Sequence, residues 1–146
     1  MILPELENQD RDEVLKEMVS FLKKLGRIGK EKELFEKLCQ REELGSTAIR
    51  DGVAIPHCKM KSMKDPLVML AISRKGVDFH AVDGSPSFIL FLVVSSSDNP
   101  SLNLQILAAV AHLVRKADAL CKRILEAGDP ASIMAAIQEE ENRLHA

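Results

Sequence analysis

The sequence contains no tryptophan and no tyrosine, and phenylalanine, with five copies in 146 residues, supplies all of its aromatic side chains. Proteins that bind nucleic acid usually show a surplus of basic residues, often with aromatic platforms on which bases stack. Here 20 basic and 22 acidic residues leave a net charge of −2, without a long block of one sign. We therefore expect no nucleic acid among the partners of this protein.

Cysteine is also scarce, and its three copies are Cys39, Cys58 and Cys121. They are too few for a disulfide framework, and none lies in the Cys-x-x-Cys spacing of a zinc knuckle. The histidines are scattered and do not form a metal-binding pattern with acidic residues. We expect free thiols in a reducing compartment, and we expect neither a metal nor another cofactor.

Long apolar runs are missing, since the longest one, residues 88–94, is only strand-sized. A membrane-spanning helix needs about 18 or more apolar residues. The first residues, Met1 to Glu5, have neither the basic head nor the apolar core of a signal peptide. We expect a cytoplasmic protein without direct membrane insertion. Its length is sufficient for one domain with a sizeable core, which we assign to residues 1–146.

Two helices are predicted near the start of the chain. Asp10 and Glu13 have capping-box spacing, and the apolar residues that follow at helical spacing predict an amphipathic helix that ends at Gly26. Residues 30–41 carry apolar side chains on one face, which predicts a second helix with Arg41 at its C-terminal end.

Strands are predicted at residues 53–55, 67–72 and 88–94, with a further short one at 77–79. Every position of 88–94 is apolar, which is typical of a strand buried on both faces and covered by helices. Three helices should follow: one opened by Asn99 and Pro100, one near residues 120–127, and one after Asp129. The inward stripe of the first is expected to consist of Leu102, Ile106, Ala109, Val110 and Leu113. The predicted fold class is α/β, a three-layer α/β/α domain with a mixed sheet of about five short strands flanked by helices.

The most informative stretch runs from Arg41 to His57. It contains Arg-Glu, then Ser-Thr, and then the run Gly-Val-Ala-Ile-Pro-His. Pro56 biases the residue before it towards an extended backbone, so His57 should lie just past a short buried strand and face a cleft. From these residues alone, a structural histidine remains more common than a reactive one.

This stretch resembles the signature of the fructose/mannitol class of enzyme IIA domains, including the nitrogen-regulatory branch, in the bacterial phosphoenolpyruvate-dependent sugar phosphotransferase system. The resemblance covers nearly the whole chain and implies the same fold. It implies that His57 is a phosphoacceptor that takes a phosphoryl group from the phosphocarrier protein HPr and passes it to a cysteine of an enzyme IIB partner. The alternatives are a nitrogen-regulatory protein that binds target proteins according to His57 phosphorylation, and a fold-mate that has lost transfer.

The resemblance also assigns residues around the histidine. Arg41 stands sixteen positions before His57, as the family's motif arginine does, and is expected to stabilise the highly charged transition state of phosphoryl transfer. Ser46 and Thr47 match the family's Ser-Thr pair, and their hydroxyls are expected either to bind phosphoryl oxygens or to cap the loop. Asp51 is expected to steer the partner or to serve as a turn residue.

Asn103 marks a departure from the family. Many relatives carry a second histidine there, in a His-Leu pattern at the start of a helix, beside the phosphorylated one. An asparagine amide can donate a hydrogen bond to a phosphoryl oxygen, but it cannot carry positive charge or exchange a proton. We therefore expect slower transfer, or a protein that serves as a sensor.

Two further expectations concern the neighbours of His57. Cys58 adjoins it, but consecutive residues on an extended backbone project to opposite sides, which argues against a Cys-His catalytic pair. Partner proteins should contact a shallow apolar rim around the histidine, with Met60 and Met63 as members.

Overall fold

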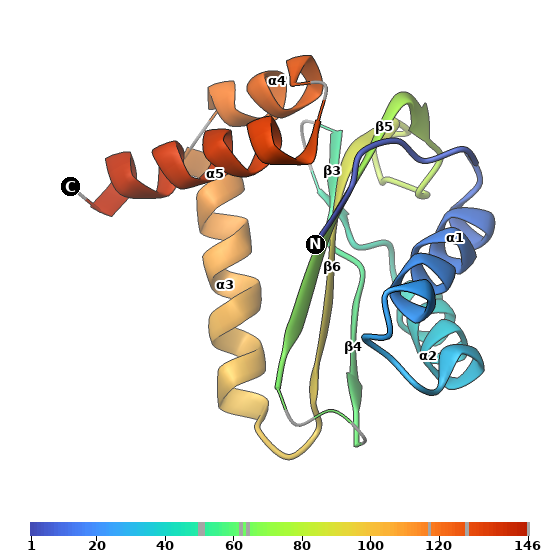
Figure 1. Cartoon of the computed structure of the whole chain (residues 1–146). Coiled ribbons are helices and arrows are strands. Elements are labelled where there is room, and N and C mark those ends of the chain that lie inside the picture. Colours follow the sequence, from blue (N-terminus) through green and yellow to red (C-terminus); the bar gives the residue numbers. More distant parts are fainter. Residues whose placement is uncertain (50–51, 62, 64, 117, 128, 146) are drawn as a thin grey trace.

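In the part of the chain that the structure describes, two helices cover one face of a central sheet and three lie on the other (Figure 1). The structure is a computed structural model that describes residues 1–49, 52–61, 63, 65–116, 118–127 and 129–145. The first face carries α1 (Arg11–Lys24) and α2 (Glu31–Glu43), and the second carries α3 (Pro100–Lys116), α4 (Asp118–Glu126) and α5 (Pro130–His145). The predicted three-layer α/β/α fold is confirmed.

The sheet is mixed and, in the described part of the chain, has six strands. They are β1 (Ile2–Leu3), β2 (Ala48–Ile49), β3 (Val53–Ala54), β4 (His57–Met60), β5 (Leu67–Val77) and β6 (Ser87–Ser96). Their order is β1-β5-β6-β3-β2, and β4 also pairs with β6. β1 runs parallel to β5, and β3 and β4 run parallel to β6, whereas β5 is antiparallel to β6 and β2 is antiparallel to β3.

The strand count and lengths differ from the expectation of about five short strands. β1 and β2 have two residues each, too few to give a periodic signal. β5 has 11 residues because the strand expected at 67–72 continues through a register shift as far as Val77. Such a shift interrupts the apolar pattern without ending the pairing. The separate strand expected at 77–79 is wrong, since Asp78 forms only an isolated bridge with Asp10 and Phe79 lies outside the sheet.

β6 is the central strand, and its side chains alternate between two cores. Leu90, Leu92 and Val94 pack in the core under α1 and α2. Ile89 and Val93 belong to the other core, which the helices α3 to α5 cover. The strand is therefore buried on both faces, as its uniformly apolar sequence predicted.

The helix boundaries agree with the predicted starts and stops. Asp10 is the N-cap of α1, although its side chain makes no capping hydrogen bond. Gly26, just past the end of α1, has a φ of +70°, a conformation that glycine adopts without a steric cost. Arg41 lies in the last turn of α2, as expected.

The inward stripe expected of α3 is wrong in part. Asn103 is buried with 3% of its surface exposed, Ile106 and Val110 are half-buried, and Ala109 is exposed. The side chain of Leu113 lies outside the described residues. The residues that pack inward are Ile106, Leu107, Val110 and Ala111, which form one stripe with the buried Asn103 and leave Ala109 on the outer side of the helix. Figure 1 shows α4 and α5 at one end of α3.

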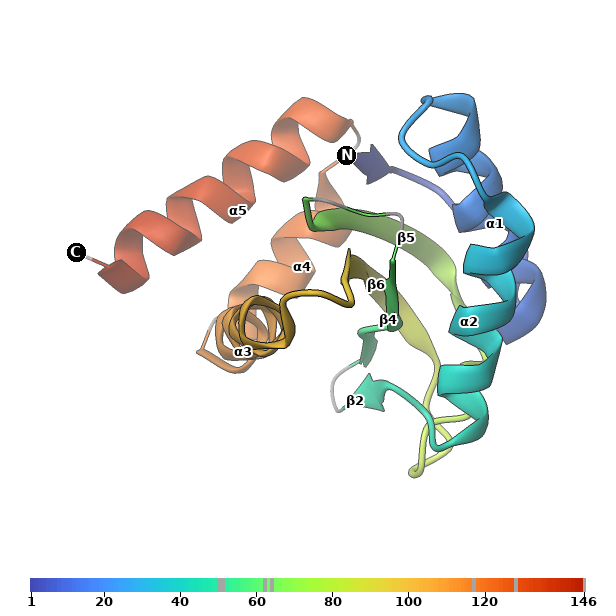
Figure 2. The ribbon, with the colours of Figure 1, turned by 90° about the horizontal axis from the view of Figure 1, so that it is seen from below.

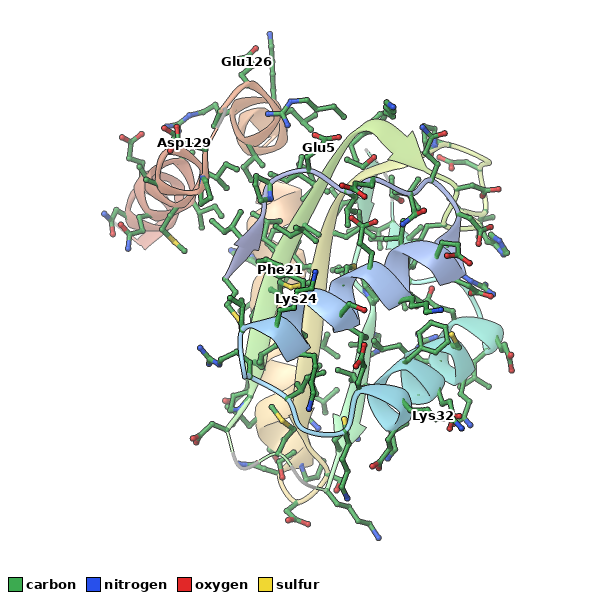
Figure 3. The ribbon with its side chains drawn as sticks, turned by 45° about the vertical axis from the view of Figure 1, so that its right-hand side comes forward. Glu5, Phe21, Lys24, Lys32, Glu126 and Asp129 are labelled. Carbon is green, nitrogen blue, oxygen red and sulfur yellow. The ribbon has the colours of Figure 1, made fainter. Side chains whose placement is uncertain are left out.

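Figure 3 views the molecule towards α1 and α2, with Phe21 and Lys24 on the first helix and Lys32 on the second. It also shows that Glu126 and Asp129 lie where α4 passes into α5, away from that pair of helices. Among the described residues, no helix has the length and apolar character needed to cross a bilayer.

Candidate active site

His57 begins β4 at a break in the edge of the sheet. β3 ends at Ala54 and β4 starts at His57, and both strands pair in parallel with β6. Between them, the Ile55 N–H donates to Thr47 O at 3.1 Å, and Pro56 O accepts the N–H of Val93 at 3.0 Å. The histidine therefore follows a short buried strand and is held by backbone bonds on both sides of the break.

Both ring nitrogens of His57 have hydrogen-bond partners. Nδ1 lies 2.8 Å from the carbonyl oxygen of Ile55, and Nε2 lies 3.3 Å from Nε of Arg41. A carbonyl only accepts and a guanidinium only donates. These contacts therefore select the neutral tautomer with the proton on Nδ1 and the lone pair on Nε2.

Arg41 reaches the ring from the last turn of α2, which packs against β4. Its Nη1 donates to the carbonyl oxygen of Gly45 at 2.9 Å, so the guanidinium bridges the loop after α2 and the imidazole. Figure 2 shows how the chain leaves α2, passes through β2 and returns along β4 at one edge of the sheet. The structure thus brings together Arg41 and His57, the two residues to which the resemblance assigns the central roles.

The loop after α2 is closed by a buried carboxylate. Glu42, 3% exposed, accepts the Thr47 N–H at 3.0 Å through Oε1 and the Thr47 hydroxyl at 2.7 Å through Oε2. Ser46 donates its hydroxyl to Phe79 O at 2.5 Å and accepts the N–H of Ala48 at 3.1 Å. Both hydroxyls are therefore engaged in loop contacts.

Glu42 is the residue near the site that the sequence analysis did not single out. The sequence feature that could have pointed to Glu42 is the presence of Arg-Glu and Ser-Thr in one motif. The spacing alone did not show that the chain folds back sharply enough to place Thr47 on the carboxylate of Glu42.

Asn103 lies at the start of α3, close to the end of β6. Its Nδ2 donates to Ser96 O at 3.2 Å, and Ser96 pairs with Met60, three residues along β4 from His57. Its Oδ1 is buried without a hydrogen-bond partner in the described part of the structure. One amide N–H is therefore used within the fold, and the other N–H and Oδ1 remain. Asp51 lies outside the described residues.

Cys58 faces away from the imidazole. His57 pairs with Val93, which faces the core under α3, whereas Cys58 pairs with Val94 and packs in the core under α1 and α2. Burial raises the pKa of the Cys58 thiol to about 12, only partly offset by the nearby ammonium of Lys37. A thiol in this state is a poor nucleophile, so the neighbouring pair does not form a Cys-His dyad.

The expected methionine rim is wrong for Met60. Met60 is buried with 2% of its surface exposed, and Met63 packs partly against the same core. Met60 is the last residue of β4, and its side chain lies on the inner face that an alternating strand must fill. Within the described residues, no group of three or more histidine, cysteine or acidic side chains is placed to hold a metal ion.

Two curated relatives represent two kinds of protein. The nitrogen regulatory protein of Bradyrhizobium diazoefficiens is 32% identical over 136 residues, which cover 93% of this chain and 88% of the relative. The fructose-specific EIIABC component of the Bacillus subtilis phosphotransferase system is 29% identical over 136 residues. This match covers 93% of the present chain but only 21% of the much longer relative.

Two solved structures share the fold. The nitrogen regulatory protein IIA-Ntr of Neisseria meningitidis has a TM-score of 0.82 at 24% identity, with coverage of 93% of this chain and 91% of that one. The enzyme IIA of the Escherichia coli mannitol system, solved in complex with phosphorylated enzyme IIB, has a TM-score of 0.76 at 13% identity. That alignment covers 94% of each chain.

The family model that matches the chain extends over residues 1–140. It describes the EIIA 2 component of the phosphoenolpyruvate-dependent sugar phosphotransferase system. The match includes every element that forms the site, from α2 to the start of α3. The chain therefore belongs to the EIIA 2 family of this phosphotransferase system.

Proposed function

We propose that this protein is a cytoplasmic phosphohistidine carrier that accepts a phosphoryl group on Nε2 of His57. The observation that carries the proposal is the pair of contacts on the imidazole, with Nδ1–H bound to Ile55 O and Nε2 facing Arg41. A neutral imidazole with a fixed lone pair is a ready nucleophile. The donor is a phosphorylated HPr-like carrier protein, by analogy with the family.

The proposed transfer needs no metal and no cofactor bound by this chain. The Nε2 lone pair of His57 attacks phosphorus, a new P–N bond forms, and the bond to the donor imidazole breaks with its electron pair. Throughout the transfer the proton stays on Nδ1, where it is hydrogen-bonded to Ile55 O. In the onward step, a cysteine thiolate of the acceptor attacks phosphorus and the electron pair returns to Nε2.

Arg41 supplies the fixed positive charge in this scheme. Its Nε lies 3.3 Å from Nε2, on the side from which phosphorus must approach, so the guanidinium moves onto the phosphoryl oxygens as the group arrives. A planar guanidinium binds such oxygens in a bidentate manner. The bond from Nη1 to Gly45 O keeps it close to the ring during that movement.

The acceptor in a transport role is the cysteine of an enzyme IIB. The structure of the mannitol enzyme IIA in complex with phosphorylated enzyme IIB supports this choice, because the two proteins share the fold. Three exposed apolar side chains support protein docking: Leu44, beside the Gly45 that binds Arg41, is 85% exposed, Ile49 in β2 is 37% exposed and Val82 is fully exposed. Ile49 and Val82 line one hollow beside β2. These residues replace the methionines as the proposed contact rim.

A second candidate function is regulation, in which the phosphorylation state of His57 selects a target protein. The nitrogen regulatory relative supports it through its identity and its matching length. Asn103 supports it as well, because it leaves the site without the second imidazole that many relatives have. A phosphoryl group adds up to about two negative charges, enough to alter a docking surface.

Phosphorylation in a reconstituted system tests the proposal. The protein is incubated with phosphoenolpyruvate, enzyme I and HPr, and intact mass is measured for the wild type, His57→Ala and the control His112→Ala, whose histidine is exposed on α3. Gain of one phosphoryl group by the wild type and the control, but not by His57→Ala, is expected. Phosphorylation that persists in His57→Ala would overturn the assignment.

Onward transfer separates the two functions. The phosphorylated protein is mixed with a fructose- or mannitol-type enzyme IIB, and loss of its phosphoryl group is followed with time. Rapid loss supports transport, and retention supports regulation. Asn103→His is expected to raise the rate of phosphorylation if the absent imidazole limits it, and an unchanged rate would remove that part of the explanation.

A further inference from the structure

We propose that Glu42 is a positioning residue that fixes the tautomer of His57 without touching it. The inference deepens the proposed function and rests on it, because it concerns the nitrogen that would receive the phosphoryl group. It starts from an unusual feature at the end of α2: Glu42 is only 3% exposed, and its carboxylate forms no ion pair with a cation of the described residues.

A buried carboxylate needs compensation, and here the donors belong to one residue. Thr47 gives Glu42 its backbone N–H at 3.0 Å and its hydroxyl at 2.7 Å. Removing a water-exposed carboxylate from solvent is costly unless hydrogen bonds replace the lost water. The two bonds therefore determine where Thr47 sits relative to the end of α2.

The position of Thr47 is then passed to the imidazole by two further hydrogen bonds. Thr47 O accepts the Ile55 N–H at 3.1 Å, and Ile55 O accepts Nδ1–H of His57 at 2.8 Å. Glu42, Thr47, Ile55 and His57 thus form an unbroken series of contacts. Its last bond selects the tautomer in which Nε2 carries the lone pair.

The loop after α2 also positions the guanidinium of Arg41. Gly45 donates its N–H to Glu42 O at 3.1 Å, and its own carbonyl accepts Nη1 of Arg41 at 2.9 Å. One folded-back loop therefore holds both reacting groups, the imidazole from one side and the cation from the other. Displacements of about 1 Å in such arrangements can reduce a rate roughly a hundredfold.

The role is geometric rather than electrostatic, and this distinction can be tested. A glutamine at position 42 can keep both contacts, because its Oε1 accepts the Thr47 N–H and its amide donates to the Thr47 hydroxyl, which reverses direction. Glu42→Gln should therefore preserve the site without a charge. Glu42→Ala removes both contacts, and Thr47→Val removes only the hydroxyl one.

The main measurement is the tautomer of His57, read from the ring-nitrogen chemical shifts of isotope-labelled histidine in the unphosphorylated protein. The wild type and Glu42→Gln are expected to show Nδ1–H, and Glu42→Ala a mixture with Nε2–H. Glu43→Ala, at an exposed neighbouring glutamate, is the matched control and should leave the shifts unchanged. The phosphorylation rate is expected to fall roughly tenfold to a hundredfold in Glu42→Ala and less than threefold in Glu42→Gln.

Unchanged ring shifts in Glu42→Ala would overturn the inference. A phosphorylation rate that falls as far in Glu42→Gln as in Glu42→Ala would also overturn it, because the negative charge of Glu42 would then be the required property. If Glu42→Ala does not fold, Thr47→Val provides the test. We expect a partial shift of the His57 tautomer to Nε2–H in that variant, and an unchanged tautomer would contradict the scheme. Since the tautomer is read without phosphoryl transfer, this outcome is independent of whether His57 proves to be a phosphoacceptor.

Discussion

Gly52 provides a sharp test of how the short strand before His57 is packed. Its φ is +78°, and a Cβ added there would lie 2.8 Å from Cδ2 of Phe88. A non-glycine residue in the left-handed region costs about 1–2 kcal/mol, and overpacking adds about 1–3 kcal/mol. Because alanine reduces the conformational freedom of the unfolded chain, it offsets this destabilisation by about 0.4–1 kcal/mol. We expect Gly52→Ala to lower the free energy of unfolding by about 2–4 kcal/mol.

Gly26→Ala is the matched control, because its φ is +70° and no heavy atom lies within 4 Å of the added Cβ. It carries the backbone penalty without the clash, so we expect a loss of only about 1 kcal/mol. Urea denaturation followed by circular dichroism suits this chain, since it has no tryptophan or tyrosine for fluorescence. Equal losses in the two variants would refute the packing argument. In a Phe88→Ala background, which removes the ring atoms that the added Cβ would meet, Gly52→Ala should cost no more than Gly26→Ala.

Three other predictions concern charge and burial. Arg41→Lys keeps the charge but loses the planar fork, so we expect the phosphorylation rate to fall roughly a hundredfold in the reconstituted assay, and a rate equal to wild type would contradict this. The pKa of Cys58 is raised from 9.0 to about 12, so the thiol stays protonated in the folded state where the unfolded chain ionises. The free energy of unfolding should therefore decline as pH rises above 9.0, and less so in Cys58→Ala. Asp129 caps α5 through the N–H and hydroxyl of Ser132, at 2.9 and 2.8 Å, which lowers its pKa below 3.8. Asp129→Ala should lower the melting temperature at neutral pH, and this difference should shrink as pH falls through the lowered pKa, because the stabilisation by the carboxylate is lost there.

The fold could be predicted from the sequence where local pattern and burial agree. The uniformly apolar run around Leu90 predicted a strand covered on both faces, and the spacing after Asp10 predicted a helix with one buried face. Prediction failed where neighbours decide the outcome. Met60 was expected on an exposed rim around the histidine, yet pairing with Ser96 extends β4 and turns its side chain into the core. Two-residue strands such as β2 exist only because a partner strand is present.

The two central residues of the candidate site were proposed from the sequence, but the contacts that hold them were not. The spacing from Arg41 to His57 is a property of the motif, and the resemblance assigned both residues. The contacts of Glu42 depend on the angle at which the chain leaves α2, and no local pattern encodes that angle. Asn103 was found as a departure from the family pattern, but its hydrogen bond to Ser96 depends on the packing of α3 against the end of β6.

The proline before His57 explains why the histidine can bond to a carbonyl so close in the chain. A continuous strand would engage Ile55 O and the N–H of residue 56 in its hydrogen-bonding pattern, but Pro56 has no N–H and β3 ends at Ala54. Pairing with β6 resumes through Pro56 O and the Val93 N–H. Ile55 O is thereby available to the Nδ1–H of His57, two residues further on. The interruption between β3 and β4 therefore frees the carbonyl that binds Nδ1–H, and this bond leaves the lone pair on Nε2. The site thus depends on a strand that is interrupted at Pro56 and paired with β6 on either side of it.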